Sequence, residues 1–326
     1  MNPVIFVDTG TTNSRVWLMK ENEILVRAEA MVGVRDTARE GNNDRLKAAL
    51  HDLIAEVQMT HKASAVIAAG MITSALGLAD IPHLSAPIGI AELAANTKAF
   101  SFPDITDLPF YLVTGVRSGS SKCTPENVNA VDLMRGEETL CLGLLENFPA
   151  PFSVLNLGSH WKVILVDATG RVASSVTTIS GELIYATQTQ TILASAVPHE
   201  KPDFIDYEWA LAGMREQQNS GLARALFCVR LLEQKSESTP EQRFSFLVGA
   251  FVSSDFEGFT KSHTLRNDHQ ILITGNGVIG KFWEKLLNES GFTARVLHQN
   301  ETEAAFLNGL GSCYSMIEKN VRKSDE

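Results

Sequence analysis

A short turn of small polar residues follows the first apolar stretch of the chain. Residues 8–15 read DTGTTNSR, and Asp8 stands at the end of the apolar run 4–8. The turn itself consists of Gly10, Thr11, Thr12 and Asn13. Backbone N–H groups and hydroxyls in such a turn donate hydrogen bonds to phosphate oxygens, and a neighbouring carboxylate can hold the Mg²⁺ that phosphate brings. The same residue types also suit an ordinary hairpin turn, so this turn alone does not decide between the two interpretations.

A second turn of the same kind occurs between two later apolar stretches. Gly158, Ser159 and His160 form it, and Lys162 follows two residues after His160. Two such turns facing one another could grip one polyphosphate. Both turns lie between two apolar stretches that are expected to be strands, and this correspondence favours phosphate binding over residue types that merely suit a hairpin turn.

A third glycine-rich segment, QILITGNGVIG at residues 270–280, leads from an apolar stretch into an expected helix. Gly275, Asn276 and Gly277, with Gly280, also spell GxGxxG. A turn of this kind lets a flat ring or a phosphate approach the backbone, and a helix N-terminus favours anions. No acid ends a following strand at the distance that a dinucleotide site requires. The segment is therefore interpreted as an adenine-side turn.

Two trios of short strands are expected to position these turns. The first trio spans 4–8, 15–19 and 23–30, and the second spans 153–157, 161–167 and 171–178. Helices and strands alternate after each trio. In the first half, helices are expected at 44–58 and about 134–147, and strands at 65–70 and 110–115. In the second half, helices are expected near 180–195, 204–217, 221–234 and 240–257, from 277 and from about 301, and strands at 270–275 and 293–297. Residues 118–130 are expected to form a linker or mobile loop. The shared plan predicts a duplicated α/β architecture with a cleft between the halves. A single α/β domain with insertions is the alternative.

Composition and charge exclude several classes of protein. The chain has 326 residues, which fits two domains, and a net charge of −10, which repels nucleic acid and anionic lipid. Its four cysteines have neither zinc-site nor disulfide-framework spacing, which indicates reduced thiols. No apolar run is long enough to span a membrane, and Met1-Asn2-Pro3 carries no basic flank or cleavage site. We therefore expect a soluble, unexported protein that binds neither nucleic acid nor membrane.

Several segments together resemble one family. They are DTGTTNSRVW (8–17), AGMITSALG (69–77), IPHLSAP (81–87), LMRGEET (133–139), GSHWK (158–162), TISGEL (178–183) and the small residues Ala304, Ala305 and Gly309. In these the chain resembles the 2-dehydro-3-deoxygalactonokinase family, within the superfamily of sugar kinases, heat-shock chaperones and actin. It departs from the family at Thr9 and Val163, where an aromatic residue is usual, and in the adenine-side turn. That turn leaves the nucleotide preference open.

The resemblance implies a duplicated RNase H-like fold, as in actin-like ATPases, with an interdomain cleft. Residues 1–132 with the final helix 301–326 would form the N-terminal domain, and residues 133–300 the C-terminal domain with a helical insertion. ATP and Mg²⁺ would be the cofactors, and the cytoplasm the location. Oligomeric state stays open, including a homo-oligomer.

The resemblance also implies roles for particular residues. Asp8 would handle Mg²⁺, residues 10–13 and 158–160 with Lys162 would bind phosphate, and residues 275–277 would face the nucleoside. In related sugar kinases the catalytic base is an acid at the start of the helix before the second trio, where this chain has Glu137. Glu138 and Asp132 compete for this role. An ordinary acid in the first turn of a helix is the alternative for Glu137.

A sugar-acid substrate would need an arginine for its carboxylate. Arg135 is the first candidate, and Arg117 or Arg35 the second, because a guanidinium pairs with both carboxylate oxygens. A solvated surface arginine is the alternative for each, and it is the favoured interpretation of Arg35 and Arg117. The resembling segment 69–77 adds Met71 and Ser74 as substrate-binding candidates. The expected reaction is ATP-dependent phosphorylation of the primary hydroxyl of a 2-keto-3-deoxy sugar acid, with 2-dehydro-3-deoxy-D-galactonate as the expected substrate. The alternatives are a kinase for another small sugar or sugar acid, and an actin-like nucleotide-dependent switch.

Overall fold

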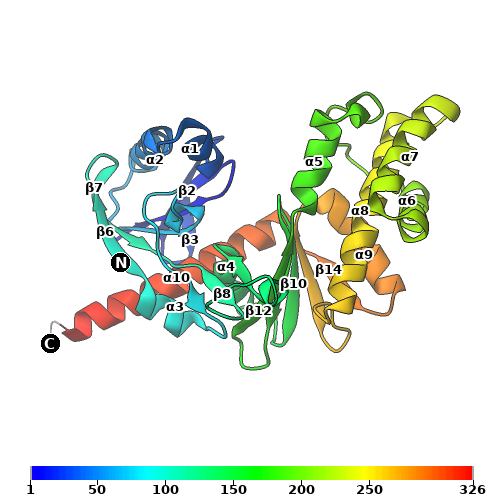
Figure 1. Cartoon of the computed structure of the whole chain (residues 1–326). Coiled ribbons are helices and arrows are strands. Elements are labelled where there is room, and N and C mark those ends of the chain that lie inside the picture. The colour runs from blue at the N-terminus through cyan, green and yellow to red at the C-terminus, as the bar shows by residue number, and fades with distance from the viewer. Residues whose placement is uncertain (1, 325–326) are drawn as a thin grey trace. The chain divides into compact units, whose positions relative to one another are not determined.

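The computed structural model describes residues 2–324, and for 321–324 the backbone only. Its contacts divide the chain into two units (Figure 1). Unit 1 contains the residues up to Ala150, Val166–Ser174 and the segment from Glu303 onward, and unit 2 contains Pro151–Leu165 and Ser175–Thr302. The first division along the chain therefore falls after Ala150 and not after residue 132 as expected.

The main sheet of unit 1 has the strand order β3-β2-β1-β4-β7-β6. Its strands are β1 (Val4–Thr9), β2 (Ser14–Lys20), β3 (Glu23–Ala30), β4 (Val66–Gly70), β6 (Lys98–Phe102) and β7 (Thr106–Leu112). The first three strands are antiparallel, and β4 runs parallel to β1. In this register Asp8 lies opposite Arg15 on β2 and Ala69 on β4. The carboxyl ends of β1 and β4 therefore meet at one edge of the sheet.

Helices cover both faces of this sheet. The amphipathic helix α2 (Asp44–Val57), preceded by α1 (Val34–Glu40), buries Leu46 and Leu50 against Ile5 and Val7. On the other face, α10 (Gln299–Ser324) places Phe306 6.2 Å from the Trp17 ring, centroid to centroid. The Glu303 carboxylate of α10 accepts a 2.8 Å hydrogen bond from the Trp17 indole. Residues at the two ends of the chain thus share one core.

A small three-stranded sheet leads into α4 (Glu137–Leu144). It consists of β5 (Leu84–Ser85), β8 (Val116–Ser118) and β9 (Asp132–Met134), and α3 (Ile90–Asn96) follows β5. A helix was expected from about residue 134, but the chain is still in β9 there. Gly136 then adopts a φ of 100°, outside the helical range, and α4 begins at Glu137.

Two close contacts explain why α4 belongs to unit 1. A Cβ atom on Gly143 of α4 would lie 1.8 Å from the Ala305 carbonyl oxygen of α10, and one on Gly309 would lie 2.1 Å from that of Thr139. Only glycine permits such an approach of two helix backbones. The hairpin segment 166–174 also belongs to unit 1, where Val172 forms an antiparallel bridge with Ile88.

Unit 2 repeats the strand plan of unit 1. Its sheet has the order β12-β11-β10-β13-β14, and β10 pairs parallel with β13. The strands are β10 (Phe152–Leu157), β11 (Trp161–Val166), β12 (Val172–Thr178), β13 (Gln270–Gly275) and β14 (Thr293–Val296). The helices are α5 (Ser180–Gln190), α6 (Tyr207–Ser220), α7 (Leu222–Lys235), α8 (Pro240–Lys261) and α9 (Gly277–Glu289). Across the sheet of each unit the strands of the trio lie in the order third, second, first, and the next strand pairs parallel with the first. This shared order confirms the expected duplicated RNase H-like fold class.

Other sequence expectations concern cysteines and membranes. Within residues 2–324 the four cysteines form no disulfide; Cys141 and Cys313 are buried, and Cys123 is exposed. Within residues 2–324, the helices lack the combination of length and apolar composition needed to cross a bilayer.

Candidate active site

Asp8 lies at the carboxyl end of β1 and is paired with Arg15. The distance from Arg15 Nη2 to Asp8 Oδ2 is 2.5 Å, and the Asp8 side chain is 16% exposed. Burial raises the pKa of Asp8, Arg15 lowers it, and the negative charge of Glu137 raises it further. Asp8 and Glu137 are therefore electrostatic neighbours although they are distant in sequence.

Two glycines bring α4 to Asp8. A Cβ atom on Gly70, at the end of β4, would lie 3.1 Å from Asp8 Oδ1. A Cβ atom on Gly136 would in turn lie 3.1 Å from the Gly70 Cα atom. Side chains at these positions would push α4 away from the sheet edge. These two contacts bring Asp8, the predicted Mg²⁺ ligand, close to Glu137, the first residue of α4, in unit 1.

The three acids that compete as catalytic base differ in environment. Glu138 is fully buried, and its two carboxylate oxygens lie 2.8 and 2.9 Å from the backbone nitrogen of Gly136, which donates to them. Glu137 is only partly buried, and its Oε2 accepts a 3.0 Å bond from the backbone N–H of Arg135. Asp132 lies on β9, opposite Ser118. Burial thus favours Glu137 over Glu138 as a group that can meet a substrate.

Arg135 is engaged by the protein itself. Its Nη1 donates to the carbonyl oxygen of Thr73 at 2.6 Å and to the hydroxyl of Thr73 at 2.9 Å, and its Nη2 donates to the carbonyl oxygen of Ile81 at 2.8 Å. The side chain is nearly buried and lies 3.8 Å from Asp80. The terminal nitrogens of Arg135, which would have to bind a substrate carboxylate, thus donate to Thr73 and Ile81 of the protein itself. These contacts favour a structural role over the predicted one, because they tie residues 73–81 to the start of α4.

The other substrate-binding candidates also lie in unit 1. Arg117 on β8 donates from Nη2 to the Ser85 hydroxyl at 2.6 Å, while its Nε is buried without a hydrogen-bond partner among the described residues. The Ser74 hydroxyl donates to the carbonyl oxygen of Met71, whose side chain packs against the core. Arg35 lies in the first turn of α1. Of these residues, Arg117 has a donor left to satisfy.

The first predicted phosphate turn is held from behind by the start of α1. The carbonyl oxygens of Gly10 and Thr11 accept hydrogen bonds from the N–H groups of Val34 at 3.2 Å and Arg35 at 2.9 Å. A Cβ atom on Gly33 would lie 2.6 Å from the Thr11 carbonyl oxygen. In a trans peptide the C=O and N–H groups point in opposite directions. The N–H groups that follow these carbonyls therefore point away from α1, as a phosphate cradle requires.

The second predicted phosphate turn is held in the same way by the start of α5. The Ser159 carbonyl oxygen accepts a 2.7 Å bond from the N–H of Glu182. A Cβ atom on Gly181 would lie 2.2 Å from the Gly158 carbonyl oxygen. Gly33 and Gly181 both follow the third strand of a trio, a correspondence that sequence reasoning missed. Superimposing the two trios in the sequence would have aligned them.

The remaining predicted residues of unit 2 surround this turn. Asn276 donates its N–H to the Leu157 carbonyl oxygen at 3.1 Å, and its Oδ1 caps α9 by accepting from Val278 and Ile279. Gly275 has a φ of 91°, and a Cβ atom on Gly277 would meet open space. The structure therefore brings residues 275–277 beside the turn at 158–160. Lys162 is buried on β11, and His160 Nε2 lies 3.4 Å from Glu182 Oε2.

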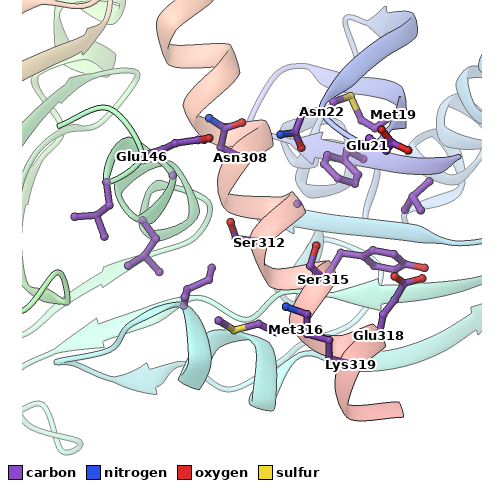
Figure 2. Close-up of a pocket in the computed structure, with 18 of the residues that line it drawn as sticks. Met19, Glu21, Asn22, Glu146, Asn308, Ser312, Ser315, Met316, Glu318 and Lys319 are labelled. Atoms are coloured by element: carbon purple, nitrogen blue, oxygen red, sulfur yellow. The ribbon is translucent and has the colours of Figure 1, made fainter. Parts of the chain in front are cut away.

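A separate cavity of about 770 Å³ lies along α10 in unit 1 (Figure 2). Figure 2 shows Met19 and Asn22 on one side of it, Glu146 on the other, and Ser312 of α10 between them. Val4, at the amino end of β1, also lines this cavity, whereas Asp8 lies near the carboxyl end of the strand. The predicted site residues do not line it.

Comparison with solved structures identifies the fold. The fold is that of the actin-like ATPases and sugar kinases. A protein from Sinorhizobium meliloti assigned as a 2-dehydro-3-deoxygalactonokinase has a TM-score of 0.75 at 23% identity, covering 96% of this chain and 99% of that one. The activator of 2-hydroxyisocaproyl-CoA dehydratase from Clostridium difficile, solved with bound ADPNP, has a TM-score of 0.52 at 11% identity and covers 98% and 97%.

The family follows from sequence comparison. The model of the 2-keto-3-deoxy-galactonokinase family matches residues 8–313, and the chain therefore belongs to this family of kinases. A 2-dehydro-3-deoxygalactonokinase from Escherichia coli strain K12 is 24% identical over 281 residues, which cover 85% of this chain and 87% of that protein. The expected family and the expectation of a kinase are confirmed.

Proposed function

We propose that the protein transfers the γ-phosphoryl group of ATP to the primary hydroxyl of a 2-keto-3-deoxy sugar acid, with 2-dehydro-3-deoxy-D-galactonate as the substrate. The observation that carries this proposal is the meeting of Asp8 and Glu137 at the edge of the unit 1 sheet, in a chain of this family. Because the reaction consumes ATP, we propose the cytoplasm as its location.

Glu137 is proposed as the general base. Phosphoryl transfer needs a group that accepts the proton of the attacking hydroxyl, and a positioned carboxylate can do so. Glu137 is the partly buried acid beside Asp8, whereas the oxygens of Glu138 are directed at the Gly136 N–H. Glu138 is then a structural group that holds the start of α4.

Asp8 is proposed to hold Mg²⁺. Within residues 2–324, no three or more His, Cys, Asp and Glu side chains group into a metal cage. This fits Mg²⁺, which is usually bound by one or two carboxylates together with substrate phosphates and water. The Asp8 carboxylate, at the end of a strand and beside the first turn, is the required type of ligand. When bound, Mg²⁺ neutralises charge on the phosphates.

Backbone groups are proposed to bind the nucleotide. The N–H groups of the turns at 10–13 and 158–160 would donate to phosphate oxygens, since their carbonyls are held by α1 and α5. Residues 275–277, beside the second turn, are proposed to contact the nucleoside. Arg117, the second candidate, replaces Arg135 as the proposed partner of the sugar-acid carboxylate, because both terminal nitrogens of Arg135 donate to backbone carbonyl groups.

Substrate-dependent release of ADP tests the proposal. The protein is incubated with MgATP and 2-dehydro-3-deoxy-D-galactonate, with other 2-keto-3-deoxy sugar acids, and without any sugar acid. We expect rapid ADP release with the first substrate only. Equal release in all reactions would indicate an ATPase switch, whereas rapid release with another sugar acid would move the substrate assignment within the family.

A further inference from the structure

A buried carboxylate in unit 2 has no role in the site described so far. Asp255 lies within α8 and is 6% exposed. A buried charged group is costly unless it is hydrogen-bonded. The hydroxyl of Thr178 donates to Asp255 Oδ2 at 2.7 Å, and the hydroxyl of Ser180, 3.3 Å from that of Thr178, also lowers the pKa of the carboxylate. Asp255 therefore joins the middle of one helix to the junction between β12 and α5.

This junction supports the second phosphate turn. Thr178 is the last residue of β12, and Ser180 is the first residue of α5. The next two residues, Gly181 and Glu182, contact the turn through the Gly158 and Ser159 carbonyl groups. Gly181 and Glu182 thus follow directly after Ser180, and they lie three and four positions after Thr178.

Apolar packing holds the elements on either side of the junction, through Val176 of β12 and Ile184 of α5, but holds the junction itself less well. Ile179, between the two hydroxyl residues, is 52% exposed, and Leu183 in the first turn of α5 is 40% exposed. Their side chains bury too little surface to hold the backbone in one place. The hydrogen bonds to Asp255 supply the fixed attachment at this point.

We propose that Asp255 is a positioning residue for nucleotide binding, which anchors Thr178 and Ser180 so that α5 holds the turn at Gly158–His160 in its phosphate-binding shape. This inference rests on the proposed function, since it assumes that the turn binds ATP. It assigns Asp255 no contact with substrate or nucleotide.

Three variants test the role. Asp255→Ala removes the anchor, and Asp255→Asn keeps an oxygen that accepts a hydrogen bond while hydroxyls can rotate to meet the amide. Ser253→Ala is the matched control, because Ser253 is also buried on α8 but donates to Gln217 of α6 at 2.6 Å and not to the junction. The measurements are KM for ATP and for the sugar acid, Kd for the Mg²⁺ complex of a non-hydrolysable ATP analogue, and Tm.

Asp255→Ala is expected to raise both the KM for ATP and the analogue Kd by about tenfold, the effect of losing one or two hydrogen bonds to a charged group. The KM for the sugar acid should change less than twofold, and Asp255→Asn should recover most of the ATP affinity. Ser253→Ala should lower Tm without changing the KM for ATP.

A lowered Tm for Asp255→Ala with parental analogue Kd would overturn the inference, because Asp255 would then be only a stability group. If Asp255→Ala does not fold, Thr178→Val decides, since it removes one donor to Asp255 and leaves Ser180. A parental Kd for Thr178→Val overturns the inference, and a weakened Kd supports it. Failure of the unmodified protein to bind the analogue would instead refute the proposed function, and the inference with it.

Discussion

Replacing Glu137 by Gln should separate catalysis from stability at the start of α4. The amide has the shape of the carboxylate but cannot accept a proton at neutral pH. In the structure Glu137 Oε2 accepts a bond from the Arg135 N–H at 3.0 Å, and the amide oxygen of Gln can take its place. We therefore expect kcat to fall about 10²–10⁴-fold, the usual contribution of a general base, while Tm stays within about 2 °C of the parent. The KM for ATP should change little.

Glu138→Gln is the matched variant on the same helix turn. Both Glu138 oxygens lie within 2.9 Å of the Gly136 nitrogen, and the residue is fully buried. An amide would place an NH₂ group against that N–H donor, at a cost of about 1–3 kcal/mol in unfolding free energy. At about 2–4 °C for each kcal/mol in a domain of this size, Tm should fall by roughly 2–12 °C. The remaining folded protein should keep more of its kcat than Glu137→Gln.

Initial rates of coupled ADP release at saturating ATP and sugar acid give kcat, and thermal denaturation gives Tm. Asp132→Asn serves as the third variant. The assignment of the base is refuted if Glu137→Gln retains more than about a tenth of the parental kcat. A larger loss in folded Glu138→Gln or in Asp132→Asn would transfer the role of base to that acid.

Three further predictions concern the proposed nucleotide site. Asp8→Asn should lower kcat by orders of magnitude. Burial raises the pKa of Asp8 above its ordinary 3.8, so the unfolding free energy of the parent falls as the pH rises from 3.8 through the pKa of the folded protein, and at pH 7 the variant should have an equal or higher Tm by calorimetry. Gly33→Ala should raise the KM for ATP about tenfold, because its Cβ atom would lie 2.6 Å from the Thr11 carbonyl oxygen. The control Gly41→Ala is strained at a φ of 72° but has no atom within 4 Å of the new Cβ, so it should lower only the Tm. Equal KM values for the two variants would contradict the role of the first turn. Gly277→Ala adds a methyl group in open space and should leave Tm unchanged or raise it, yet weaken ATP binding severalfold in calorimetric titration if the nucleoside lies there as proposed; unchanged affinity would move the nucleoside elsewhere.

The fold was largely predictable because its main elements carry strong periodic patterns. The apolar runs of β1 and β10 and the spacing in α2 directly indicate their secondary structure. The small sheet was not predicted, since strands such as Leu84–Ser85 have two or three residues and exist only through their neighbours. The same strands explain why α4 begins later than expected. Local sequence does not record a pairing partner that lies tens of residues away.

The site was predictable in part. Asp8 and Glu137 stand out by residue type at the end of a strand and at the start of a helix, and the structure brings them together. Arg135 has the same residue type as a substrate-binding arginine, but its backbone partners at Thr73 and Ile81 could not be read from the sequence. Asp255 is likewise an ordinary acid in a helical pattern until its hydroxyl partners are placed beside it.

The division of the chain has a consequence for its synthesis. The chain passes between the units after Ala150, Leu165, Ser174 and Thr302, so unit 1 contains residues from both ends. Glu303, the partner of the Trp17 indole, is added 286 residues after it, which takes roughly 15–60 s at ribosomal speeds of about 5–20 residues per second. Throughout that time the α10 side of the first sheet stays uncovered. Unit 1 is begun first but completed only after unit 2 has been synthesised, so the nascent chain must carry an exposed apolar sheet face for most of its production.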